Sequence, residues 1–154
     1  MKKVLLLISL LGILSANDES AKVVFDLTTG KLKKFEKHII KGLVFNKTQY
    51  ENSLKELEAA VVIHGKAYKF FVKDIYQTSF KEDKELALKH SELKKRIRSM
   101  YETYDVEFLV CGNGLAKRNL GKKDILDFVK IIPSSTIGLI DKQNKGFAYL
   151  PVAD

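Results

Sequence analysis

The sequence has a single cysteine, Cys111, among its 154 residues. One thiol excludes an intrachain disulfide and every metal cage that needs two or more thiolates. It also excludes a dithiol oxidoreductase, because that mechanism needs a Cys-x-x-Cys pair. Only three histidines are present, and no two of them have the four-residue spacing of a zinc-binding helix. We therefore expect no metal site.

Nucleotide-binding motifs are also missing. The run Gly112-Asn113-Gly114 follows a predicted strand, but Lys117 stands where a dinucleotide fingerprint has its third glycine. No P-loop sequence occurs. We therefore expect no nucleotide cofactor, and nothing in the sequence points to a cofactor of another kind.

The one long aliphatic run lies at the N-terminus. Two lysines precede Val4–Leu14, and the small residues Ser15 and Ala16 lead into a polar stretch, which is the order of a secretory signal peptide. The 11 residues of this mostly aliphatic run would rise only about 16 Å as a helix, roughly half of a bilayer core. We therefore expect a signal peptide at 1–16, export to the periplasm without a stable membrane anchor, and a single α/β domain at 17–154.

The positive charge raises the question of nucleic acid. The formal net charge is +8, and binding would need the cations to gather on one face. The densest basic group, 89–98, is interleaved with Leu93 and Ile97 at helical spacing, as is typical of the wet face of an amphipathic helix. We therefore expect no nucleic-acid partner.

Apolar runs alternate with segments of helical period along the rest of the chain. This alternation predicts a mostly parallel sheet covered by helices on both faces, hence a three-layer α/β domain with five strands. The predicted strands are 21–27, 58–64, 106–110, 130–132 and 147–150. The predicted helices are 85–104 and 135–144, with short helical pieces at 113–119 and 122–128.

The first helical segment has two interpretations. An apolar stripe begins at Leu32 and continues at spacings of three and four residues to Leu57. Either one helix spans the stripe, or Thr48 and Glu51 form a capping box that begins a second helix. The pattern alone does not decide between them.

Ligands of parallel sheets bind beyond the carboxyl ends of the strands. Three groups of residues are predicted to lie there: Thr28–Gly30, His64 with Gly65, and the segment from Cys111 to Gly114. These groups are the candidate site.

Cys111 carries the most chemistry. It ends a strand and precedes a helical segment, so backbone N–H groups of Gly112, Asn113 and Gly114 and the positive end of a helix dipole should lie near its sulfur. Such surroundings lower the pKa of a thiol and increase the nucleophilic thiolate, provided that the sulfur is accessible. Gly112 and Gly114 have no side chains that would crowd a molecule at the sulfur. The alternative is a buried structural cysteine that behaves as a small hydrophobe.

His64 is the second candidate. At a strand end beside Gly65, it would bind an anion or share a proton with Cys111 and thereby set the thiolate population near neutral pH. The alternative is a histidine that caps local backbone groups. His38 and His90 lie beside lysines in predicted helices, and we expect both to face solvent.

One stretch has a specific order. After the strand that begins at Val106 comes Cys-Gly-x-x-x-x-x-Arg, formed by Cys111, Gly112 and Arg118, then Lys-Asp-Ile-Leu, a Val-Lys-Ile-Ile-Pro-Ser strand end, a helix and Gly-Phe-Ala-Tyr. This order resembles the DsrE family, the small sulfur-relay-related proteins that include DsrE, TusD and YchN-like members. The runs VVFDLTTG and VVIHG are similar to the first two strands of that family.

The resemblance implies a flavodoxin-like domain that assembles into homo-oligomers, either trimers or hexamers. It also implies that a cysteine at the position of Cys111 accepts sulfur as a persulfide from a donor protein and passes it to an acceptor protein. A sulfurtransferase-like carrier of this kind needs one good thiolate and no resolving cysteine. The second hypothesis is a non-catalytic oligomeric module whose crevice, with the same His64 and Gly112–Gly114, binds a small ligand or a partner.

Overall fold

The computed structural model describes residues 20–154. The predicted signal peptide, 1–16, lies outside the described residues. The fold contains a five-stranded sheet in the order β4-β3-β2-β1-β5, and every pair of neighbouring strands is parallel. The strands are β1 (Ala21–Leu27), β2 (Leu57–Ile63), β3 (Glu107–Cys111), β4 (Lys130–Ile132) and β5 (Ala148–Val152). The predicted α/β fold with a five-stranded, flavodoxin-like sheet is confirmed.

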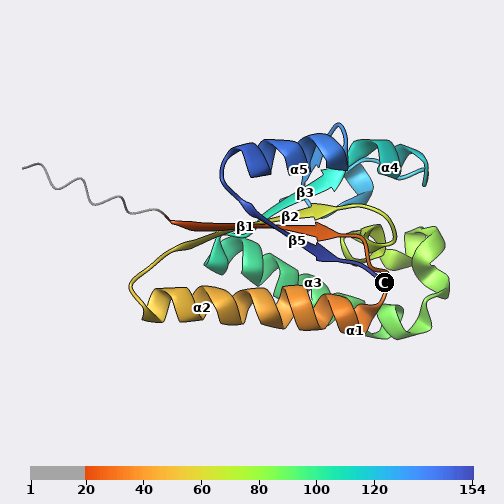
Figure 1. The fold of residues 1–154 in the computed structure, drawn as a ribbon. Coiled ribbons are helices and arrows are strands. Elements are labelled where there is room, and N and C mark those ends of the chain that lie inside the picture. Colours follow the sequence, from red (N-terminus) through yellow and green to blue (C-terminus); the bar gives the residue numbers. More distant parts are fainter. Residues whose placement is uncertain (1–19) are drawn as a thin grey trace, which may run out of the picture.

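Helices cover both faces of the sheet and make the predicted three layers (Figure 1). On one face lie α1 (Leu32–Phe35), the π-helical stretch η1 (Glu36–Leu43), α2 (Val44–Asn52) and α3 (Lys84–Tyr104). On the other face lie α4 (Gly112–Ala116) and α5 (Ser135–Asn144). Short 3-10 turns fill the connections: η2 (Ala67–Phe70), η3 (Ile75–Gln77), η4 (Ser79–Glu82) and η5 (Lys122–Asp124).

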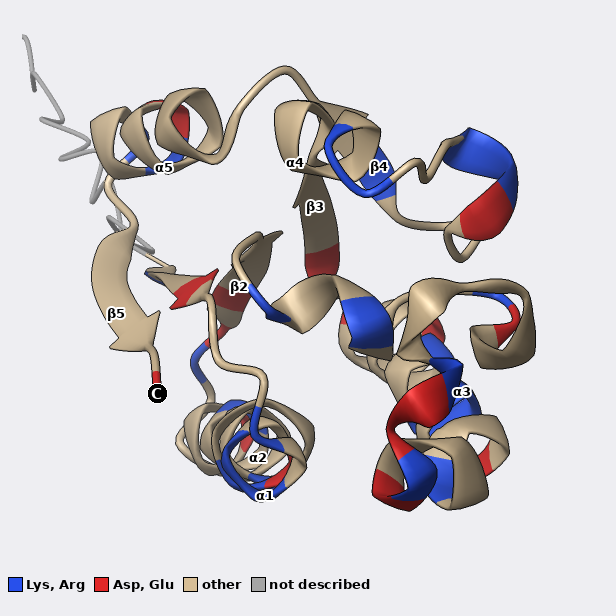
Figure 2. Cartoon of the chain, turned by 90° about the vertical axis from the view of Figure 1, so that its right-hand side faces the viewer, with Lys and Arg blue, Asp and Glu red and all other residues tan. Residues whose placement is uncertain are grey.

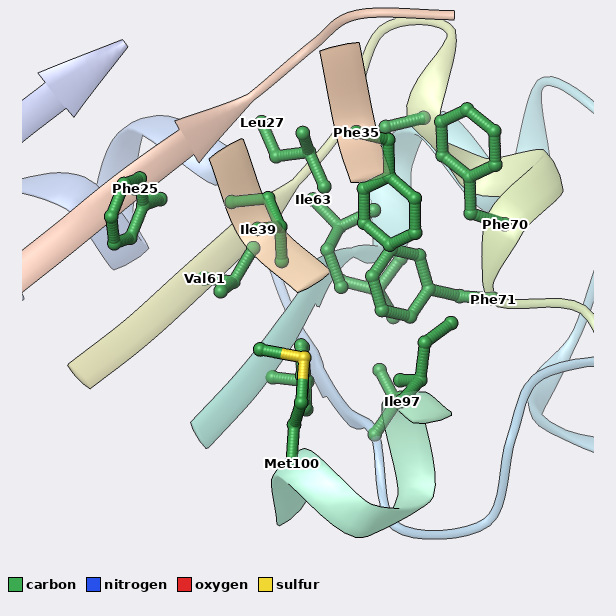
Figure 3. Close-up of a cluster of buried hydrophobic side chains, with 14 of the residues drawn as sticks. Phe25, Leu27, Phe35, Ile39, Val61, Ile63, Phe70, Phe71, Ile97 and Met100 are labelled. Carbon is green, nitrogen blue, oxygen red and sulfur yellow. The ribbon is translucent and has the colours of Figure 1, made fainter. Parts of the chain in front are cut away.

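The larger core lies between the sheet and the helices α1 to α3. Alternate residues of β1 and β2, such as Phe25 and Ile63, meet Phe35 and Ile39 from the first helical segment and Ile97 from α3 (Figure 3). The rings of Phe35 and Phe70 stack with centroids 4.4 Å apart. Full burial of such side chains contributes roughly 1.5–3 kcal/mol each, so this face is the main source of stability.

The face under α5 has a smaller core. Val24, Ala60, Val62, Leu109 and Phe147 form it. These residues come from the opposite pleat of the same strands, because successive strand residues point to opposite faces. Burial on both faces explains why β1 and β2 are nearly continuous apolar runs.

The first helical segment is one continuous helix from Leu32 to Asn52, interrupted only in its hydrogen-bond pattern by the π-helical stretch. The hydroxyl of Thr48 donates to the carbonyl of Val44 at 3.1 Å within the helix. Thr48 is therefore an interior residue, and the capping-box alternative is wrong. The apolar stripe stabilises this continuous helix, because the first half of the stripe packs against the sheet.

The ends of α3 and α5 follow local signals. Asp83 accepts a hydrogen bond from the Leu86 N–H and caps α3, and Asp105 ends this helix in the left-handed region at φ 48°. Ser134 accepts from the Ile137 N–H at 3.2 Å and caps α5. Pro133 directly follows β4, in agreement with the rule that proline closes a strand.

Two sequence expectations are wrong. Within 122–128, only Lys122–Asp124 form a helical turn, and Ile125 instead makes an isolated antiparallel bridge with Val72. His90 is buried, with 5% of its surface exposed. It lies four residues after Leu86 and three before Leu93, so it belongs to the buried stripe of α3 despite its lysine neighbours.

The strand order brings the residues that follow β1 close to the end of β5. The chain runs from β1 to β2 on one side, whereas β5 pairs with the other side of β1. The N–H groups of Thr28 and Thr29 both donate to the carbonyl of Val152. The strand ends that carry the predicted site residues therefore meet at a single edge of the sheet, which Figure 2 faces. Within residues 20–154, no helix has the length and apolar character needed to cross a membrane.

Candidate functional site

Cys111 is the last residue of β3 and the N-cap of α4. It is free and buried, with 7% of its surface exposed. The accessible sulfur that a reactive thiolate requires is therefore not present in this conformation. The first turn of α5 and the ring of Tyr68 lie against Cys111, which explains the burial.

The surroundings of the sulfur are nonetheless polar. Burial raises the pKa of the Cys111 thiol. The N–H groups of Gly114 and Ser135 and the hydroxyls of Tyr68 and Ser135 lower it by a larger amount, so the net pKa lies below the ordinary value. Hydrogen-bond donors favour the charged form of an acid. The site thus provides a cradle for a thiolate, built from the starts of α4 and α5 and from η2.

Tyr68 is a fixed donor. It is fully buried in η2, and its hydroxyl donates to the carbonyl oxygen of Cys111 at 3.0 Å. Burial raises the pKa of Tyr68, so its hydroxyl keeps its proton. Arg118 lies over the other side of the ring, with its guanidinium carbon 4.5 Å from the ring centroid. The same guanidinium donates to the carbonyls of Gly114 at 3.0 Å and Gly65 at 2.5 Å.

Each residue of the predicted glycine segment has a structural role. A Cβ on Gly114 would lie 1.8 Å from the Tyr68 hydroxyl oxygen, and a Cβ on Gly112 would lie 3.1 Å from the carbonyl oxygen of Ile132. Both glycines therefore permit close approach of neighbouring elements. The N–H of Asn113 donates to the carbonyl of Pro133 at 3.4 Å, which ties α4 to the end of β4.

His64 directly follows β2, and Cys111 is the last residue of β3. Ile63 pairs with Val110 in the sheet, so the next residues, His64 and Cys111, lie beside each other on adjacent strands. Its imidazole, however, is bound on the β1 side. The Nε2 of His64 lies 2.5 Å from Asp26 Oδ1, and the Tyr149 hydroxyl donates to Asp26 Oδ2 at 2.7 Å. Within the described residues, no hydrogen bond joins His64 to Cys111.

Gly65 forms the turn after His64. Its φ is +63°, and a Cβ there would meet the carbonyl oxygen of Thr28 at 3.1 Å. The left-handed conformation and the close approach of two strand ends both require glycine. Its carbonyl accepts from Arg118, so Gly65 links the β2 end to α4.

Sequence reasoning missed four residues of this site: Asp26, Tyr68, Ser135 and Tyr149. Asp26 had a detectable signal, because it is the one acidic residue in a strand that is apolar apart from Lys22. Ser135 entered the sequence analysis only as the first residue of a predicted helix. Tyr68 comes from a short apolar segment that gives no hint of its neighbour 43 residues away. Across residues 20–154, no group of three or more His, Cys, Asp or Glu side chains is placed to hold a metal ion.

Comparisons with known proteins agree with this geometry. A model of the DsrE/DsrF-like family matches residues 22–152. An uncharacterized protein of Aquifex aeolicus (strain VF5) is 31% identical over 133 residues, which cover 84% of this chain and 55% of that protein. This chain therefore spans about half the length of that relative.

A solved structure shows the same fold. The protein of unknown function MTH1491 from Methanobacterium thermoautotrophicum matches with a TM-score of 0.56 and 19% sequence identity, and the match covers 86% of this chain and 99% of that chain. At this identity the likeness concerns the fold alone. The family match extends from β1 to β5 and includes the Cys111 turn. On this evidence the chain belongs to the DsrE/DsrF-like family.

Proposed function

We propose that this protein is a periplasmic sulfur carrier in which Cys111 accepts sulfur as a persulfide and passes it to a partner protein. Its fold is one related to sulfur-relay proteins. The observation that carries the proposal is a lone thiol at the N-cap of α4, where neighbouring polar groups hold its pKa below the ordinary value. A structural cysteine in a core has no need of such groups, because it is neutral.

The chemistry balances without an external oxidant. The Cys111 thiolate attacks the outer sulfur of a donor persulfide, the donor S–S bond breaks, and the donor leaves as a thiolate. A partner thiolate then attacks the outer sulfur on Cys111, and Cys111 leaves as a thiolate in turn. A lowered thiol pKa assists this second step, because thiols of lower pKa leave faster.

His64 supports proton movement in this proposal. His64 lies one register position past Ile63, beside Cys111 in the sheet, while its imidazole is bound to Asp26 on the β1 side. Adjacent strands are about 5 Å apart. Asp26 orients the ring through Nε2, and Tyr149 holds Asp26 in place. His64 thereby takes up or returns the proton of the incoming or leaving thiol.

The experiment that tests sulfur transfer uses mass spectrometry. The purified protein is incubated with a small persulfide donor and then analysed intact and after proteolysis. We expect a gain of one sulfur atom on the peptide that contains Cys111, and no gain in Cys111→Ser. An unmodified wild-type mass, under conditions in which iodoacetamide does label Cys111, would overturn the proposal, because the thiol would then be accessible but not an acceptor.

Self-association is part of the same proposal. Ile137 and Ile140 on α5 and Tyr149 on β5 are exposed, and α5 contacts β5. We call these three residues the α5–β5 surface. Exposed apolar groups that lie together favour association. We propose that this surface is buried between copies of the chain in a homo-oligomer, a trimer or a hexamer.

A further inference from the structure

A basic cavity lies at the edge of the sheet where β1 and β2 end. Its volume is about 480 Å³, and its lining includes four cations, Lys31, Lys66, Lys69 and Arg118, and one carboxylate, that of Asp154. Figure 2 faces this edge, with the start of α1 and the C-terminus close together below β2 and β5. Cys111 does not line the cavity.

Three of the cations are held in place. The Nζ of Lys69 lies 2.6 Å from Asp83 Oδ2, and that of Lys66 lies 2.9 Å from Asp154 Oδ2. Arg118 is fixed by its two carbonyl acceptors and by the Tyr68 ring. A guanidinium has five N–H donors, so Arg118 has donors left for a ligand. Lys69 and Arg118 keep these partners when a ligand displaces Asp154, so they lose less entropy on binding an anion than free surface lysines.

An anion already occupies part of the cavity. The carboxylate of Asp154 accepts from the Thr29 hydroxyl at 2.5 Å, from the Gly30 N–H at 3.2 Å and from Lys66 at 2.9 Å. The hydroxyl of Thr29 and the ammonium of Lys66 hold the pKa of Asp154 well below its ordinary value. A backbone N–H, a hydroxyl and an ammonium are the donors that phosphate and carboxylate groups select.

We propose that this cavity binds a small polyanion with two or more phosphate or carboxylate groups, and that Asp154 is a tethered competitor for it. One group of the ligand replaces the Asp154 carboxylate on Thr29, Gly30 and Lys66. A second group meets Lys69 and Arg118. The site does not depend on sulfur transfer at Cys111.

The test is a calorimetric titration of the full chain with inorganic pyrophosphate at constant ionic strength. We expect saturable binding at one site. Lys66→Gln should weaken it about tenfold, the effect of losing one charge-assisted hydrogen bond. Asp154→Asn should strengthen it severalfold, because the competing charge is gone. Thermal denaturation of both variants shows whether each is folded.

Controls locate the site. Lys145→Gln makes the same charge change on an exposed lysine at the far end of α5 and should leave the affinity unchanged, as should Cys111→Ser. Lys94→Gln tests a rival basic cavity that Lys73, Lys94 and Arg98 line. Loss of binding in Lys94→Gln but not in folded Lys66→Gln would overturn the assignment.

A parallel titration with citrate separates the two ligand chemistries. Binding of pyrophosphate alone would assign a phosphate compound, and binding of citrate alone a carboxylate compound. No saturable binding of either probe would overturn the proposal. Equal or weaker affinity in Asp154→Asn would overturn the competitor role.

Discussion

Gly114 and Tyr68 are in such close contact that a Cβ on Gly114 would lie 1.8 Å from the Tyr68 hydroxyl oxygen. That hydroxyl donates to the carbonyl of Cys111 and faces its sulfur. The donor can keep this position only while residue 114 has no side chain. A glycine next to the thiol thus determines the electrostatics of the thiol through a third residue.

Gly114→Ala is expected to destabilise the protein by about 1–3 kcal/mol, the usual cost of overpacking a core. Without this contact, alanine would stabilise the helix at this position. A loss of stability would therefore show that the contact with Tyr68 outweighs the helix propensity of alanine. The substitution should also raise the thiol pKa of Cys111, because Tyr68 must move. Urea denaturation measures the first effect, and the pH profile of alkylation measures the second.

Gly121→Ala is the matched control. The nearest atom to a Cβ at Gly121 is a carboxylate oxygen of Asp124 at 3.9 Å, and the φ of −129° suits any residue. We expect a change in stability within about 0.5 kcal/mol. Equal losses in the two variants would contradict the role of the Gly114–Tyr68 contact.

The alkylation of Cys111 should show two separate effects. The maximal rate should be lower than that of an unfolded peptide thiol, because the side chain is buried. The midpoint of the rate against pH should lie below that of the unfolded chain, because the polar groups near the sulfur lower the pKa of the thiol. A slow rate with a midpoint above the unfolded value would identify Cys111 as an inert structural thiol.

Tyr68→Phe should raise the midpoint of that alkylation profile, since it removes a hydroxyl that helps to lower the pKa of the Cys111 thiol. The matched control is Tyr76→Phe, which deletes the same hydroxyl from an exposed ring and should leave the midpoint unchanged. Loss of a buried hydroxyl costs about 1 kcal/mol of stability, so both variants are compared well below their melting temperatures.

Glu107 is expected to stabilise the fold at neutral pH and to lose that effect in acid. Burial raises the pKa of Glu107, but the hydrogen bonds from Lys142 and Lys130 lower it by a larger amount, so the net pKa is below the ordinary value. A lowered carboxyl pKa stabilises the native state above the unfolded pKa and loses that effect as the pH falls through the folded value.

Glu107→Gln should therefore cost about 1 kcal/mol at pH 7 and less as the pH falls below about 4. Denaturant titrations at several pH values provide the measurement. Glu92→Gln, on the exposed face of α3, makes the same change outside these ion pairs. A pH-independent cost at Glu107 would mean that packing, rather than charge, explains its effect.

Self-association is tested by gel filtration with light scattering. We expect the chain without residues 1–16 to elute as an oligomer, and Ile137→Lys to shift it toward the monomer, because the lysine brings a charge into the α5–β5 surface. Leu88→Lys changes an exposed leucine on α3, away from this surface, and should not alter the mass. A monomeric wild-type protein at micromolar concentration would rule out the proposed oligomer.

The fold was largely predictable because its signals are local. Each strand is a short apolar run with a turn residue after it, and the predicted bounds of β1 and β4 agree with the structure. His90 was misassigned because its lysine neighbours outweighed its spacing from Leu86 and Leu93. The helical prediction for 122–128 failed because the contact that shapes this segment, between Ile125 and Val72, joins distant parts of the chain.

The candidate site was predictable only in part. Parallel strands place their carboxyl ends at one edge, so Cys111 and His64 were expected as neighbours in the sheet, and the register agrees. The orientation of His64 toward Asp26 was not predictable, because both faces of β2 are possible until the register with β1 is known. Burial of Cys111 by Tyr68 and Ser135 likewise depends on tertiary packing.

The position of β1 between β2 and β5 has a consequence for biosynthesis. Val23 to Leu27 pair with Ala148 to Val152, so one side of a central strand has no partner while the ribosome makes most of the chain. An open strand edge is a template for pairing with other chains, and nascent chains in this state are prone to aggregate. Completion of the sheet therefore waits for the last strand to be translated.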